Sequence, residues 1–186
     1  MSTRGAVGFI VDGVEKISYN HSDSYPDYLG RNILEFCFVL PHDIAKKIVK
    51  KIKLVGDIPP TAKQIKECKK FTNLNVSEKS TKDWYCLLRE AQGNLWVYID
   101  GLKYMINYKG FLKESLFCEY AYIVNLDTGK LEFYTGFNKN SNAGRYANVK
   151  ADEYGYVGVA FCSEYDLSSI TKDSIDDIIK DMNKRS

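Results

Sequence analysis

The sequence has no apolar run near the roughly 20 residues that a membrane-spanning helix needs. It has only two histidines and no Cys-x-x-Cys pair, so the usual zinc ligand sets are missing. No phosphate-binding glycine loop, dinucleotide-binding motif or metalloprotease motif occurs. These absences predict a protein without a metal, a cofactor or a membrane segment. The N-terminus also lacks the apolar core of a secretory signal, which predicts a cytoplasmic location.

Neither sign of charge is in large excess. Lys and Arg number 26 and Asp and Glu number 24, which gives a formal net charge of +2. A protein that mimics nucleic acid should be strongly acidic, and a general DNA-binding protein strongly basic. The overall charge indicates neither class.

The cysteines are odd in number, and most of them lie among apolar residues. This pattern is typical of buried, reduced thiols in a cytosolic protein rather than of a disulfide framework. The five positions are Cys37, Cys68, Cys86, Cys118 and Cys162.

What the chain does contain indicates one globular domain spanning residues 1–186. Apolar residues make up 45% and charged residues 27% of the 186, close to the average of folded domains. The turn and periodicity signals predict an α+β fold, with a largely antiparallel sheet covered by helices. Its expected elements are an N-terminal hairpin, helices near 24–40, 43–54, 61–71 and 81–92, a second hairpin at 118–137, a loop at 138–153, a strand at 154–162 and a helix from 171.

The N-terminal hairpin carries the most specific prediction. The Asp-Gly dipeptide at 12–13 favours a two-residue turn, because both central residues of a type I′ turn need positive φ. Val11 then pairs with Val14, and counting back along both strands sets every other pair. Directly opposite residues share a face of the sheet. The open end of the hairpin is therefore predicted to gather Ser2, Arg4, His21 and Asp23 on one face.

Three interpretations of this cluster compete. In the first, Asp23 forms a salt bridge with Arg4, and Ser24 starts the following helix. In the second, Arg4 binds an anion while His21, Asp23 and Tyr25 orient it. In the third, removal of Met1 gives Ser2 a free amine beside its hydroxyl, the arrangement used by N-terminal-nucleophile hydrolases.

Three stretches of the sequence resemble a family of proteins encoded by tailed phages and prophages. Its members begin Met-small-Thr-Arg and carry a later His or Gln, an Asp-x-Tyr-Pro segment and a glycine. Many members have Trp-Asp-Gly-Tyr-Pro where this chain has Ser-Asp-Ser-Tyr-Pro at 22–26, and their second residue varies, which argues against an obligatory Ser2 nucleophile. The resemblance maps onto Thr3, Arg4, Asp23, Tyr25 and Pro26. The three stretches are STRG, YNHSDSYPDYLGRNILEF and LFCEYAYIVNLDTGKLEFYTGF.

The resemblance implies a phage- or prophage-encoded accessory protein that acts by binding in the host cytoplasm. Its expected target is a host defence system, such as a CRISPR effector or a signalling-nucleotide system, so that the partner is a host defence protein or a ribonucleoprotein. The alternative function is a small hydrolase or amidase of the N-terminal-nucleophile type that uses Ser2. The candidate binding residues are Ser2, Thr3, Arg4, His21, Asp23 and Tyr25.

A second candidate surface is rich in lysine. If two predicted helices lie side by side, their outer faces form a basic patch that binds polyanions weakly, because lysine contacts phosphate by charge and no arginine is placed to recognise bases. The alternative is a solvated outer face without a partner. The patch residues are Lys46, Lys47, Lys50, Lys51, Lys63, Lys66 and Lys70. The 14 tyrosines are interpreted mainly as strand residues.

Overall fold

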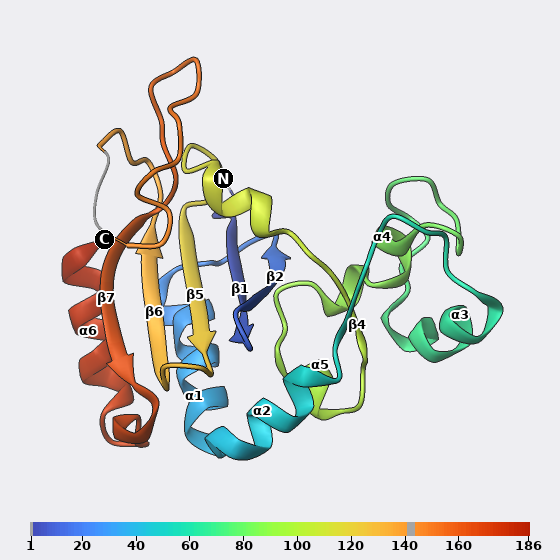
Figure 1. The fold of residues 1–186 in the computed structure, drawn as a ribbon, viewed down its shortest axis with the longest axis horizontal. Coiled ribbons are helices and arrows are strands. Elements are labelled where there is room, and N and C mark those ends of the chain that lie inside the picture. Colours follow the sequence, from blue (N-terminus) through green and yellow to red (C-terminus); the bar gives the residue numbers. More distant parts are fainter. Residues whose placement is uncertain (1, 141–143) are drawn as a thin grey trace.

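The computed structural model describes residues 2–140 and 144–186. Its centre is a five-stranded sheet in the order β2-β1-β5-β6-β7 (Figure 1). A second, two-stranded sheet pairs β3 with β4 in parallel. The strands are β1 (Gly5–Val11), β2 (Val14–Asn20), β3 (Lys53–Val55), β4 (Tyr104–Ile106), β5 (Tyr120–Asn125), β6 (Lys130–Thr135) and β7 (Ala160–Asp166).

The helices follow the hairpin in sequence and return at the C-terminus. They are α1 (Arg31–Val39), α2 (His42–Lys50), α3 (Ala62–Cys68), α4 (Trp84–Leu87), α5 (Trp96–Ile99) and α6 (Ile175–Arg185). Short helical turns join them: η1 (Pro26–Gly30, a π-helix) and the 3₁₀ turns η2 (Lys69–Phe71), η3 (Arg89–Ala91), η4 (Lys109–Lys113) and η5 (Leu167–Ser169).

The predicted α+β class with a largely antiparallel sheet is confirmed. The pairs β1–β2, β5–β6 and β6–β7 are antiparallel, whereas β1 and β5 are parallel. The parallel pair places the N-terminal strand inside the sheet, with its direct hairpin partner on one side and a strand from residue 120 onwards on the other.

The first hairpin has the register that its turn residues predict. Asp12 and Gly13 have φ values of 50° and 73°, and Val11 pairs with Val14 and Ala6 with Tyr19. In the second hairpin Gly129 has a φ of 71°, the left-handed conformation expected for it, but Asn125 pairs with Lys130, so the loop has four residues, 126–129, and not the three that Asp127-Thr128-Gly129 predicts. In both cases local turn chemistry fixes the pairing of whole strands.

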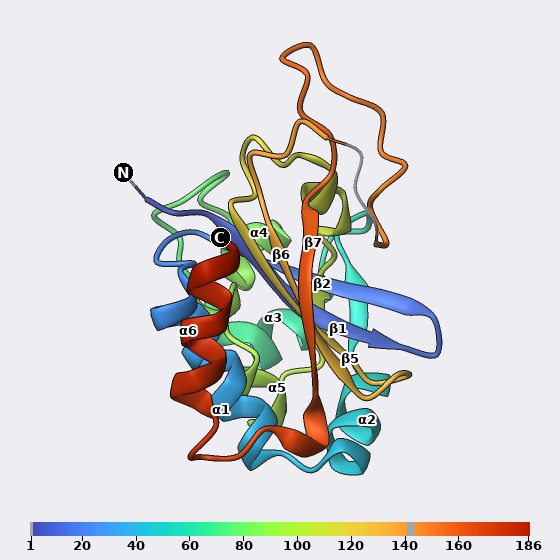
Figure 2. The ribbon, with the colours of Figure 1, turned by 90° about the vertical axis from the view of Figure 1, so that its left-hand side faces the viewer.

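The two faces of the large sheet are covered differently. The helix-covered face carries Val7, Phe9 and Tyr122 and packs against α1, α2, α5 and α6 in the larger hydrophobic core. Figure 2 shows α1 and α6 together on that side of the sheet. The loop-covered face carries Ala6 and Ile123, and irregular segments at 111–118 and 146–159 pack against it.

Several predicted boundaries are wrong, and each has a local cause. The helix predicted at 43–54 ends at Lys50, because the buried Lys16 ammonium binds the carbonyls of Val49 and Ile52 at 2.8 and 2.6 Å, and residues 53–55 join β4 instead. The fourth helix begins after Asp83, whose carboxylate accepts a hydrogen bond from the Tyr85 amide.

The late strand is also displaced from its prediction. It runs from 160 to 166 rather than from 154 to 162, and the preceding residues cover the sheet as a loop. The loop predicted at 138–153 includes residues 141–143, which lie outside the described residues. On its far side, Tyr146 is buried against the sheet.

Candidate functional site

The open end of the hairpin gathers part of the predicted cluster. Arg4 and His21 extend the side of the hairpin that carries Tyr19, as the register predicts. The His21 ring stands edge-on to the Tyr19 ring at 4.4 Å, and Arg4 hydrogen-bonds to Tyr19. The exposed Ser2 hydroxyl donates to the main-chain carbonyl of His21. Ser2, Arg4 and His21 therefore do come together.

Asp23 and Tyr25 leave this cluster. Strand pairing ends at Gly5 and Asn20, and Asp23 then takes a left-handed φ of 55° as the chain turns toward η1. The Tyr25 ring lies 5.8 Å from Tyr120, on the opposite side of the sheet from Arg4. Within the described residues Asp23 forms no ion pair with Arg4, so the predicted salt bridge is absent.

Thr3 and Ser24 hold the backbone at this end. The Ser24 amide donates to the Thr3 carbonyl at 3.3 Å, and the Ser24 hydroxyl accepts from Asn20 at 2.8 Å. A Cβ on Gly5 would lie 2.7 Å from the Ser24 side chain, so only glycine allows this approach. Ser24 does not start the helix as predicted; η1 begins at Pro26, with Tyr25 as its N-cap. The main chain of Thr3 and the amide and hydroxyl of Ser24 therefore make structural contacts, and a binding role for the Thr3 side chain stays a prediction.

Arg4 is positioned without a carboxylate partner. Its guanidinium lies 5.0 Å from the centre of the Phe117 ring, which gives a cation–π contact. Its backbone amide donates to Glu119 at 3.1 Å, so that carboxylate binds the main chain of Arg4. In the described part of the chain the Arg4 guanidinium forms no ion pair. Its charge is available to a ligand.

Sequence reasoning missed the four residues that complete the site, which are Tyr19, Tyr85, Arg89 and Gln92. His21 Nε2 lies 2.6 Å from Gln92 Oε1 and 3.4 Å from the Tyr85 hydroxyl. The Gln92 amide donates in turn to the Tyr108 hydroxyl at 3.3 Å. Arg89 lies close enough for its charge to act on both Tyr19 and His21. We call Arg4, Tyr19, His21, Tyr85, Arg89 and Gln92 the hairpin-end cluster.

The electrostatics of the cluster favour negative ligands. Burial, aided by the positive charge of Arg89, lowers the pKa of His21, so the imidazole is neutral at pH 7. Burial raises the pKa of Tyr19, and raises that of Tyr108 to about 12, so both phenols keep their protons. Like Arg4, Arg89 has no carboxylate partner within residues 2–140 and 144–186. The site thus offers several hydrogen-bond donors and two uncompensated positive charges.

The other end of the loop-covered face holds a second arginine in a different setting. Arg145 donates to the buried Glu132 carboxylate at 2.9 Å, and its Nε lies 3.7 Å from Glu15. Glu132 also accepts from Asn125 at 2.7 Å and from Tyr134 at 2.5 Å. Arg145 is therefore paired with the protein's own carboxylates, although its side chain is partly exposed.

The lysines predicted as a basic patch serve partly as structural contacts. Lys46 pairs with Asp127 at 3.3 Å and Lys50 with Asp12 at 3.0 Å, so α2 is fastened to the turns of both hairpins. Asp127 also accepts hydrogen bonds from the Asp12 and Gly13 amides, which lowers the pKa of its carboxyl. The charges of Lys46 and Lys50 are therefore partly neutralised.

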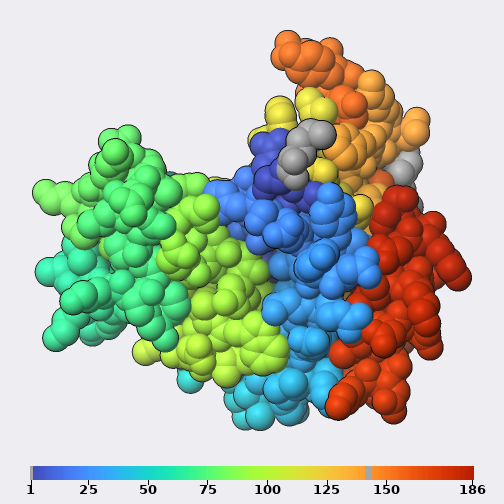
Figure 3. Space-filling view, turned by 180° about the vertical axis from the view of Figure 1, so that it is seen from behind, coloured from blue at the N-terminus to red at the C-terminus, as the bar shows by residue number. Residues whose placement is uncertain are grey.

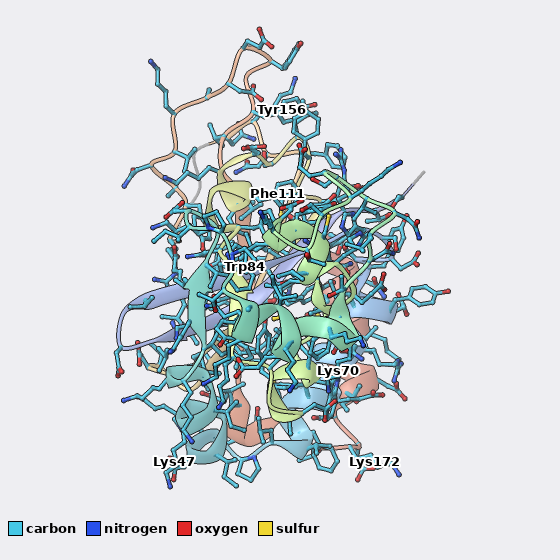
Figure 4. All side chains as sticks on the ribbon, turned by 90° about the vertical axis from the view of Figure 1, so that its right-hand side faces the viewer. Lys47, Lys70, Trp84, Phe111, Tyr156 and Lys172 are labelled. Carbon is cyan, nitrogen blue, oxygen red and sulfur yellow. The ribbon has the colours of Figure 1, made fainter. Side chains whose placement is uncertain are left out.

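The remaining patch lysines do not form one surface. In Figure 1, α2 lies beneath the sheet and α3 lies in a lobe that projects from the side. Figure 3 shows the chain around residues 85–105 between the two regions, and Figure 4 places Lys47 and Lys70 apart. Lys63 also lies 4.0 Å from Glu67. The side-by-side arrangement assumed for a continuous patch is wrong.

Other site types lack support in the described part of the chain. No group of three or more His, Cys, Asp or Glu side chains there is arranged to hold a metal ion. No helix in the described ranges combines the length and the apolar character needed to cross a bilayer. All five cysteines are free thiols. Comparison of the chain with protein-family models, with curated proteins and with solved structures finds no match in any of the three.

Proposed function

We propose that this chain acts by binding, and that the hairpin-end cluster is its binding surface for an anionic group. The observation that carries the proposal is the pair of arginines, Arg4 and Arg89, whose guanidinium groups have no carboxylate partner in the described residues. An arginine placed for stability alone is usually paired, as Arg145 is. The hydroxyl groups of Tyr19 and Tyr85 add donors close to His21.

The cellular part of the proposal rests on the sequence resemblance. STRG and the Asp-x-Tyr-Pro segment suggest a phage or prophage accessory protein in the host cytoplasm, and a host defence protein, ribonucleoprotein or signalling nucleotide is its target. Each of these targets offers phosphate or carboxylate groups to an arginine site. The proposal therefore joins a sequence likeness to a surface of matching charge.

The test uses sulfate as a simple anion and follows backbone amide NMR shifts. Saturable shifts are expected around Arg4, His21 and Gln92, and Arg4→Met and Arg89→Met should each weaken them. Lys113→Met is the control, because Lys113 is an exposed cation on η4 outside the cluster. Equal titrations for wild type and both arginine variants would overturn the proposal.

The biological arm measures phage plating on strains that each carry one defence system. Wild-type protein should restore plating on at least one strain, and Arg4→Met should abolish the effect while its melting temperature barely changes. Loss of plating in strict proportion to loss of stability would contradict a binding role for Arg4.

The alternative hydrolase depends on Ser2. Its hydroxyl is exposed and lies at the edge of the cluster, next to His21, which keeps this alternative open to test. The chemistry requires removal of Met1 so that Ser2 has a free amine. Intact mass gives the answer: retention of Met1 in active protein, or full activity of Ser2→Ala, eliminates the hydrolase.

Weak polyanion binding by α2 is a further, smaller proposal. Lys47 and Lys51 are exposed, and no ion pair holds either one in the described residues. Changing both to Glu should weaken binding of duplex DNA and flatten its salt dependence, whose slope is about 0.9 per phosphate neutralised. Anisotropy titrations at two salt concentrations test this, with Lys63→Glu and Lys66→Glu on α3 as the matched control. A DNA affinity that does not change with salt concentration, or with the Lys47→Glu and Lys51→Glu substitutions, would refute the proposal.

A further inference from the structure

The hairpin-end cluster has a second property besides its charge. Arg4 joins the charged part of the site to the Phe117 ring, which is 42% exposed. Arg4 also lies close enough to Tyr19 for its charge to counter the burial that raises the Tyr19 pKa, and the Tyr19 ring contacts the Phe111 ring edge-on at 5.0 Å. A positive, planar guanidinium therefore bridges an exposed ring and a set of hydroxyl donors.

The donors outnumber what a carboxylate can use. A carboxylate has two oxygens, whereas the cluster presents the Arg4 guanidinium and the phenols of Tyr19 and Tyr85, with the charge of Arg89 acting on the same group of residues. A phosphate has three or four oxygens and suits several donors converging from different directions. The number and spread of donors therefore favour phosphate.

The flat groups beside the phosphate position indicate what the phosphate is attached to. Nucleic-acid bases stack on aromatic side chains and on the planes of arginine guanidinium groups. Phe117 and Arg4 already form such a layered pair at the edge of the cluster. The Arg4 guanidinium is both the positive charge and one of the flat groups, and the Phe117 ring lies beside it, so one small molecule can contact both.

From these observations we infer that the hairpin-end cluster binds a nucleotide. Its phosphate contacts Arg4 and Arg89, and its base stacks on the Arg4–Phe117 pair. This inference rests on the proposed anion site and adds the chemical class of its ligand. It commits to a free nucleotide; a short single strand of nucleic acid carries the same phosphate and base, and the test separates the two.

The experiment compares three small probes by isothermal titration or NMR: adenosine monophosphate, ribose 5-phosphate and adenosine. Adenosine monophosphate should bind more tightly than ribose 5-phosphate by about 5- to 150-fold, the range that stacking of one base contributes. Adenosine alone should bind most weakly. If ribose 5-phosphate binds as well as the nucleotide, the anion site stands and the nucleotide inference fails; if neither phosphate binds, the anion site fails too.

Two variants test which residue contributes base stacking and which contributes phosphate binding. Phe117→Ser should remove the advantage of the nucleotide over ribose 5-phosphate and leave binding of ribose 5-phosphate unchanged. Arg4→Met should weaken both phosphates. Phe137→Ser is the matched control, because Phe137 is also an exposed phenylalanine, 57% accessible, whereas the cation–π contact of Arg4 is with Phe117. An unchanged nucleotide advantage in Phe117→Ser would overturn the stacking assignment.

A final arm separates the free nucleotide from a strand. A tetranucleotide of the same base should bind no more than about fourfold more tightly than the mononucleotide, the statistical factor of four equivalent units, because the cluster has one pair of arginines and one stacking platform. A gain well beyond the statistical effect of four equivalent units would reject the free nucleotide in favour of a single strand.

Discussion

Arg4 and Arg145 stand at opposite ends of the same sheet face, and they do opposite things. Arg145 pairs with the buried Glu132 carboxylate and contacts Glu15, so its charge is offset by the protein's own carboxylates. Arg4 is held by an aromatic ring and a phenol, which orient its guanidinium without cancelling its charge. The comparison teaches that the partner of an arginine, more than its exposure, indicates whether its charge serves stability or binding.

The largest expected effect comes from Arg145→Met. The change leaves the Glu132 carboxylate buried without its cation, so unfolding free energy should fall by about 1.5–3 kcal/mol, the usual contribution of a hydrogen bond to a charged group. Urea unfolding followed by circular dichroism measures it. A change below about 0.5 kcal/mol would mean that Arg145 is no more structural than Arg4.

A second substitution sharpens this result. Adding Glu132→Gln to Arg145→Met removes the uncompensated charge while keeping a polar group for Asn125 and Tyr134. The double variant should be more stable than Arg145→Met alone by about 1 kcal/mol. A double variant that loses the sum of both single effects would show that the two residues act independently.

Arg4→Met should have a much smaller effect on stability. The substitution removes one cation–π contact and leaves no buried carboxylate unpaired, so the loss should be about 1 kcal/mol or less. Sulfate affinity should nevertheless fall, whereas Arg145→Met should leave it unchanged at a temperature where that variant is folded. Thermal unfolding measures the stability of both variants, and NMR titration of the same samples measures their sulfate affinity. A larger loss of stability in Arg4→Met, or a larger loss of sulfate affinity in Arg145→Met, would contradict the comparison.

The smallest effect is a pH dependence that only the Arg4 end should show. His21 faces Tyr19, Tyr85, Gln92 and the charge of Arg89, and its pKa is lowered by burial and by Arg89. A bound anion offsets Arg89 and raises the His21 pKa, so binding takes up a proton and tightens as pH falls from about 8 to about 5. Sulfate stays a dianion over this range, so the probe does not titrate.

His21→Gln is the control for that experiment. It should bind sulfate with nearly constant affinity over the same pH range. In the unliganded protein, the lowered pKa has its own consequence: the unfolded state binds the proton first, so stability declines as pH falls through about 6.5. A wild-type affinity that rises with pH would contradict the assignment of His21 to the site.

The sequence predicted those parts of the fold that local chemistry decides. The Asp-Gly turn at 12–13 set the hairpin register, and the register placed Arg4 and His21 on one face. The helix predicted near 61–71 begins as expected, because Thr61 caps α3 through a reciprocal pair of hydrogen bonds with Gln64. These features depend on residues only a few positions apart.

The rest depends on long-range contacts that no local pattern records. Gln92 meets His21 across 71 residues, and it sits in a turn with no motif around it. Asp23 was placed with Arg4 by extending the strands beyond Gly5 and Asn20, where pairing in fact stops. The lysine patch failed because the distance between α2 and α3 is a property of the whole fold.

The position of β1 also has a kinetic consequence. Its antiparallel neighbour β2 follows after two residues, but its parallel neighbour β5 begins at Tyr120. Such a pairing must close a loop of more than a hundred residues, which favours slow folding. During synthesis the first hairpin therefore forms with the β5-facing edge of β1 still unpaired. Arg4 lies next to that edge and contacts Phe117 and Glu119 only after both residues have left the ribosome.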